Sequence, residues 1–135
     1  MFECQERVYY EDTDAGGIVY HANYLKFMER CRCKWLEHLG FNIQTLQQKQ
    51  DVLFVVRAAN LEFDAPARLF DEISVSLEVL HVGKVRLSVM QKIYNKTQLL
   101  CKAQIKLATL QGSSYKLAPM PLALQTAIKA STNVG

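Results

Sequence analysis

Residues 9–30, YYEDTDAGGIVYHANYLKFMER, combine the residue types whose spacing best suits chemistry. Three acids precede a glycine pair, and His21 follows just before a helical pattern that begins near Ala22. The first turn of a helix carries unpaired backbone N–H groups and the positive end of the helix dipole, so it stabilises an oxygen that becomes negative. A carboxylate beside such donors suits attack on an acyl carbonyl. Asp14 would sit close to these donors and is therefore a candidate catalytic carboxylate, although an Asp before a glycine pair is also typical of a simple turn.

A strand and a helix must position this segment. Residues 8–10 read as the end of an apolar strand. In residues 22–39 the apolar positions recur in steps of three and four, which predicts a helix with a broad buried face. Gly40 follows as a helix cap. Residues 41–50 read as a short helix or loop.

The second half of the chain has the alternation typical of strands. The expected strands are residues 52–63, 73–79, 85–89 and 99–107. The first opens with the continuous run VLFVV, which predicts a strand covered on both faces and central in the sheet. Because residues 81–84 and 95–97 read as tight turns, we expect a four-stranded antiparallel meander. Residues 113–121 resemble a linker, and residues 122–130 a short helix.

Composition limits the class of protein. A chain of 135 residues, half of them hydrophobic, fits one domain over residues 1–135. The formal charge is +3 and the basic residues are scattered, which argues against nucleic-acid binding. No apolar stretch approaches the roughly 20 residues that span a bilayer, so we expect a soluble cytoplasmic protein. The four cysteines do not form a secreted framework and are expected to be reduced thiols.

Two groups of residues contain metal-ligand types, and neither has the spacing that a metal site needs. A calcium loop that began at Asp12 would need Glu at its twelfth position, where this chain has Asn23. Cys31, Cys33 and His38 contain zinc-ligand types, but positions two apart on a helix point in different directions. We expect no metal.

The run YYEDTD, the following GG, VYHANYLKF and ER, and the later PARL together resemble the hotdog-fold acyl-CoA thioesterases of the 4-hydroxybenzoyl-CoA type. Among these, the chain resembles the branch associated with the bacterial Tol-Pal system, over roughly residues 7–130. The resemblance implies an α+β hotdog fold, in which a curved antiparallel β-sheet wraps around a long central α-helix. Because one scaffold hosts several reactions, the fold alone does not determine the chemistry.

The resemblance also assigns roles within the motif. It implies that the second acid of the DTD pair, Asp14, is the catalytic carboxylate, and it associates His21 and Tyr10 with catalysis. The backbone N–H of His21, with that of Tyr20 as a second candidate, would polarise the thioester carbonyl. A free Asp has a pKa of about 3.9, so activating a water would require burial, whereas direct nucleophilic attack would not. Both routes stay open.

Other polar residues near the motif have simpler interpretations. Glu11 and Asp12 are expected to order the loop. Glu29 is expected to form a salt bridge on its helix, although other hotdog enzymes place a catalytic acid there. Arg68 reads as part of a turn and is also a candidate contact for a phosphate of coenzyme A.

The activity implied is hydrolysis of an acyl-CoA thioester to a free acid and coenzyme A. Coenzyme A is then part of the substrate, so no cofactor is expected. The resemblance implies a homodimer or a dimer-of-dimers homotetramer, with sites between subunits. One alternative is a hotdog dehydratase. Another is a non-catalytic module that binds acyl carrier protein or a phospholipid-synthesis enzyme. The acyl group, and the choice between coenzyme A and acyl carrier protein as the thiol, stay open.

Overall fold

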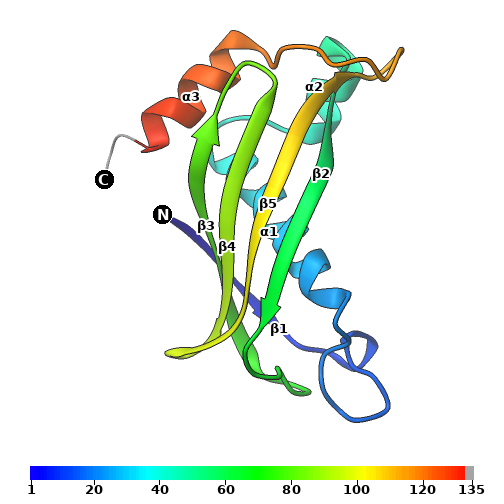
Figure 1. Cartoon of the computed structure of the whole chain (residues 1–135), viewed down its shortest axis with the longest axis vertical. Coiled ribbons are helices and arrows are strands. Elements are labelled where there is room, and N and C mark those ends of the chain that lie inside the picture. The colour runs from blue at the N-terminus through cyan, green and yellow to red at the C-terminus, as the bar shows by residue number, and fades with distance from the viewer. Residues whose placement is uncertain (133–135) are drawn as a thin grey trace.

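The computed structural model describes residues 1–132, which form one curved five-stranded antiparallel sheet with the long helix α1 (Asn23–His38) against one face (Figure 1). The strand order is β1-β3-β4-β5-β2. The strands are β1 (Phe2–Arg7), β2 (Val52–Phe63), β3 (Glu72–Val82), β4 (Arg86–Asn95) and β5 (Gln98–Gln111). This arrangement confirms the curved sheet around a central helix. The predicted domain ends at residue 135, and residues 133–135 lie outside the described part.

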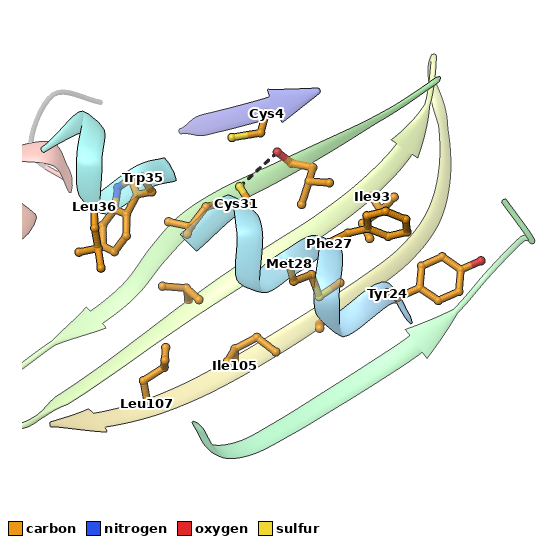
Figure 2. Close-up of a cluster of buried hydrophobic side chains, with 14 of the residues drawn as sticks. Cys4, Tyr24, Phe27, Met28, Cys31, Trp35, Leu36, Ile93, Ile105 and Leu107 are labelled. Atoms are coloured by element: carbon orange, nitrogen blue, oxygen red, sulfur yellow. Dashed lines mark hydrogen bonds between the residues drawn. The ribbon is translucent and has the colours of Figure 1, made fainter. Parts of the chain in front are cut away.

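Helix α1 follows the predicted pattern to within one residue at each end. Its buried face points at the sheet, where the Cys31 thiol donates to the carbonyl of Val75 on β3 at 3.5 Å (Figure 2). Figure 2 also shows that the strand side chains beneath the helix include Ile93, Ile105 and Leu107. Gly40 ends the helix with a φ of +93°, a conformation that suits glycine.

Two shorter helices complete the chain. Helix α2 (Ile43–Gln50) starts where the side chain of Asn42 accepts a hydrogen bond from the Thr45 N–H at 3.1 Å. Helix α3 (Leu122–Thr132) corresponds to the predicted terminal helix. α2 contacts β2 and α3 contacts β3.

Strand β2 is not central, so that prediction is wrong. It pairs only with β5 and forms one edge of the sheet, where Val56 is 49% exposed and Phe63 is 54% exposed. A continuous apolar run reports which side chains avoid water but does not report which strands lie beside it.

The four-stranded meander is also wrong, because only β3, β4 and β5 are consecutive neighbours. The connection between β2 and β3 is not a tight turn. It contains the fully buried Ala67, whose carbonyl accepts from the Val19 N–H at 2.9 Å and whose N–H donates to the Tyr24 hydroxyl at 3.1 Å. These bonds hold the connection against the N-terminal end of α1, and the chain then continues to the far side of the sheet.

The predicted strand over residues 8–10 is wrong as well. β1 ends at Arg7, and Tyr10–Asp12 form a single 3₁₀ turn. The turn forms because the Asp12 carboxylate accepts a hydrogen bond from the Tyr9 N–H at 2.9 Å. Local bonding by an acidic side chain competes here with continued strand pairing.

Candidate active site

The site loop, residues 9–22, joins β1 to α1 and lies at the lower right of Figure 1. An isolated bridge between Thr13 and Val19 closes a small hairpin within it. Inside the hairpin, the Asp14 N–H donates to the Ile18 carbonyl at 2.9 Å. Gly17 has a φ of +78°, which explains why a glycine stands there. The hairpin within the loop is therefore closed by backbone hydrogen bonds.

Asp14 stands on this hairpin and is exposed. Its Oδ1 accepts a hydrogen bond from the Gly16 N–H at 2.8 Å. A Cβ at Gly16 would lie 3.2 Å from that oxygen, so the glycine permits the close approach. Within residues 1–132, Oδ2 of Asp14 accepts no hydrogen bond. One oxygen therefore orders the turn, while the other has no hydrogen-bond partner among residues 1–132.

The start of α1 supplies a free donor next to this loop. Ala22, the residue before the helix, offers no side-chain cap. In the described part of the chain, no group accepts a hydrogen bond from the His21 N–H. The Tyr20 N–H, in contrast, donates to the Asp12 carbonyl at 3.0 Å. The structure thus leaves His21 as a candidate oxyanion donor and excludes Tyr20, whose N–H is already used.

The exposed imidazole of His21 lies among aromatic rings. Its centroid is 4.5 Å from that of Tyr20 and 6.5 Å from that of Phe63, the latter in an edge-on arrangement at 82°. Phe63 also lies 5.5 Å from Tyr24. No sequence signal points to this neighbour, since Phe63 is the last residue of β2 and is 42 positions away from His21.

Tyr10 lies on the 3₁₀ turn and is 81% exposed. Its carbonyl accepts from the Thr13 hydroxyl at 2.8 Å, which helps to shape the loop. Among residues 1–132, its own hydroxyl makes no hydrogen bond. The structure places Tyr10 on the site loop but does not join its ring to Asp14 or His21 by a hydrogen bond.

Arg68 and Glu29, the two remaining polar candidates, lie at different distances from the site loop. Arg68 is exposed, and its backbone forms a bridge with Ile18, so it borders the hairpin of Asp14. Glu29 lies eight residues beyond His21 on α1, about 12 Å along the helix at 1.5 Å per residue. It lines a cavity of about 330 Å³ with Phe54, among others, and forms no ion pair within the described residues.

The buried thiols are not activated nucleophiles. Burial raises the pKa of both Cys31 and Cys101 to about 12, from an ordinary value of 9.0. All four cysteines are free, and residues 1–132 contain no cluster of three His, Cys, Asp or Glu side chains arranged to hold a metal. No helix in this part of the chain combines the length and apolar character needed to cross a bilayer.

This chain is similar to known thioester hydrolases. The model of the thioesterase-like superfamily matches residues 8–128. The acyl-CoA thioesterase YbgC of Haemophilus influenzae is 39% identical over 130 residues, covering 96% of this chain and 93% of that protein. The acyl-CoA thioester hydrolase YbgC of Escherichia coli is 38% identical, covering 96% of both. A solved 1,4-dihydroxy-2-naphthoyl-CoA thioesterase from Synechocystis superimposes with a TM-score of 0.87 at 28% identity, covering 95% of each chain.

Proposed function

This chain belongs to the thioesterase-like superfamily, and on that premise we propose a mechanism and an assembly for it. It is an acyl-CoA thioesterase, an enzyme that hydrolyses an acyl-CoA thioester to a free acid and coenzyme A. We assign the catalytic carboxylate to Asp14, the oxyanion donor to the backbone N–H of His21, and supporting roles to the His21 ring and Tyr10. The free His21 N–H beside the Asp14 hairpin is the observation that carries this proposal.

The donor acts on the charge that develops during the reaction. When the thioester carbonyl is attacked, its oxygen becomes negative, and an N–H at the start of a helix stabilises that charge. Since no protein group accepts from the His21 N–H in the described residues, the substrate displaces none to use it. One such donor is typically worth about 10² to 10³ in rate.

Asp14 has two routes. On the direct route, one carboxylate oxygen bonds to the carbonyl carbon, the C–S bond breaks and the thiolate of coenzyme A leaves, after which water hydrolyses the acyl-aspartyl anhydride. On the water route, a water adds to the carbonyl carbon while Asp14 takes its proton; the C–S bond then breaks, and the proton passes from Asp14 to the leaving thiolate. The water route requires burial of Asp14, and in a single chain that residue is exposed.

A second copy of the chain would bury Asp14. We propose a homodimer in which the exposed edge of β2 pairs with β2 of the partner, with a dimer of dimers as the larger form. The apolar run VLFVV supports this pairing, because it stands on an edge strand where Val56 remains half exposed. We further propose that Arg68, next to the hairpin, contacts a phosphate of coenzyme A.

Other properties implied by the sequence remain predictions. These are the absence of a cofactor, the cytoplasmic location, the association with the Tol-Pal system, and acyl carrier protein as a partner. The relatives are hydrolases, which favours hydrolysis over a dehydratase reaction. A non-catalytic binding module is the remaining alternative, and measurement of turnover tests it.

The experiment is steady-state hydrolysis of short aliphatic, long aliphatic and aromatic acyl-CoA esters by wild type and Asp14→Asn. The amide retains an oxygen for the Gly16 N–H and replaces the other carboxylate oxygen with an uncharged NH2 group. We expect kcat to fall by about 10² to 10⁴. Asp51→Asn is the matched control, because Asp51 lies just before β2, at the end opposite Phe63. Absence of turnover by folded wild type would favour the binding module, and full activity in Asp14→Asn would refute the assignment of Asp14.

A further inference from the structure

Asp12 carries the only buried carboxylate in residues 1–132, and the residue is 3% exposed. The other buried polar side chains of this part of the chain are neutral: Asn23, Ser76, Gln91, Thr109 and Gln125. Removing a carboxylate from water costs several kcal/mol unless it is paired or well hydrogen-bonded. The position of Asp12 therefore depends on the hydrogen bonds around it.

Those bonds use both carboxylate oxygens. Oδ2 accepts from the Tyr9 N–H at 2.9 Å, and Oδ1 accepts from the side-chain amide of Asn23 at 3.0 Å. The backbone carbonyl of Asp12 also accepts from the Tyr20 N–H at 3.0 Å. One residue thus holds the two ends of the site loop, at the 3₁₀ turn on one side and at the first residue of α1 on the other.

The two groups assigned to catalysis lie next to these anchors. Asp14 follows Asp12 by two residues. His21 lies between Tyr20 and Asn23, both of which donate to Asp12. The Asn23 N–H also donates to the Tyr20 carbonyl at 2.8 Å, which closes the turn that carries His21. The Asp14 carboxylate and the His21 N–H are therefore both held in place by the same buried residue.

We propose that the Asp12–Asn23 hydrogen bond is a positioning contact that sets the distance between the Asp14 carboxylate and the His21 N–H donor. The proposal rests on the function assigned above. Neither residue touches the substrate. Together they hold the loop and the helix start in one frame, so that the thioester carbonyl meets the carboxylate and the donor at the same time.

The test exchanges the two partners. Asn23→Asp removes the amide donor and places a second carboxyl group against Asp12, so the Asp12–Asn23 hydrogen bond is lost and like groups face each other. A misplacement of about 1 Å costs about 10² in rate, so we expect kcat to fall about 10²-fold. KM should change much less, because the binding surface for coenzyme A remains.

The double variant Asp12→Asn with Asn23→Asp restores the contact in reverse. The amide at position 12 donates to the carboxylate at position 23, and its oxygen accepts from the Tyr9 N–H. We expect kcat to return to within about fivefold of wild type, which is a large coupling between the two positions. Asn42→Asp is the matched control, since it makes the same change at the start of α2, where Asp caps equally well.

Amide hydrogen exchange at Tyr20 gives a second readout that does not depend on turnover. Exchange should speed up in Asn23→Asp and return to the wild-type rate in the double variant. Undiminished kcat in folded Asn23→Asp, or a double variant as impaired as the single one, would overturn the positioning role while leaving the thioesterase assignment intact. Inactive wild type would instead refute the assignment on which the proposal rests.

Discussion

At the scale of single residues, Tyr24 links the site to the segment that joins β2 and β3. Its hydroxyl accepts from the Ala67 N–H at 3.1 Å, and the Ala67 carbonyl accepts from the Val19 N–H of the site loop. Tyr24 is 4% exposed, and burial raises the pKa of its phenol. A single hydroxyl therefore supports the segment that lies against the loop.

Tyr24→Phe should destabilise the protein by about 1 to 3 kcal/mol, because the buried Ala67 N–H loses its acceptor. The free energy of unfolding measured by urea denaturation checks this value. Tyr115→Phe is the matched control, since Tyr115 is 71% exposed and its change should stay within about 0.5 kcal/mol. Equal stability of the two variants would mean that Ala67 finds another partner.

His21 carries two chemical groups that one substitution separates. His21→Ala removes the ring but keeps the backbone N–H at the start of α1. We therefore expect kcat to fall by up to about 10², as for loss of a side chain that orients a proton or a water, and by less than in Asp14→Asn. Steady-state kinetics of both variants on the same ester decide this order. A loss in His21→Ala that equals that of Asp14→Asn would assign to the ring the role that we propose for the N–H.

The place of Asp14 and His21 beside a helix start was predictable from the sequence, but their supporting contacts were not. The catalytic roles of Asp14 and His21 come from the resemblance and stay predictions, and the same motif led us to expect that Asp12 orders the loop. Asn23 has no role in the sequence pattern beyond standing where a calcium loop would need Glu. Its bond to Asp12 spans 11 residues and forms only when the loop folds back, while Phe63 reaches His21 from another element.

At the scale of elements, the length and type of α1 were predictable because periodicity reports a buried face. The position of β2 at the edge of the sheet was not predictable, since an apolar run looks the same whether its side chains are buried by the same chain or by another subunit. We expected a tight turn between β2 and β3. The Ala67 hydrogen bonds instead hold this connection against the site loop and the first turn of α1, so that β3 does not pair with β2.

Val56→Lys tests the proposed pairing of β2 with β2 of a second subunit. Val56 is 49% exposed on the edge strand, so a charge there is tolerated by a monomer and opposed in a β2–β2 interface. We expect the variant to shift from dimer or tetramer to monomer in sedimentation velocity and to lose activity as the site loses its cover. Tyr115→Lys, on an exposed loop, should assemble like wild type. A monomeric wild type, or an unchanged assembly in Val56→Lys, would contradict the proposed pairing.

At the scale of the whole molecule, two thiols lie in the core between α1 and the sheet. Cys31 is 1% exposed and Cys101 is 0% exposed. Figure 2 shows Cys31 on α1 facing Cys4 of β1. Burial raises the pKa of each of these two thiols to about 12, so the folded core keeps them protonated where an unfolded chain would not.

This difference links stability to alkaline pH. Below the unfolded value of 9.0 both states keep the Cys101 proton, so the stability due to the neutral buried thiol is fully present. Above 9.0 the unfolded state releases the proton first, and the stability is lost progressively until the folded thiol ionises at about 12.

Cys101→Ala removes this pH dependence of stability at the cost of a small cavity. Relative to wild type, the variant should therefore become more stable between pH 9 and 12, by up to a few kcal/mol, about 1.4 per pKa unit. Urea denaturation of both proteins across that range measures the difference, in which the titration of the other residues cancels. Parallel stability curves would show that Cys101 ionises equally easily in the folded and unfolded states, contrary to its burial.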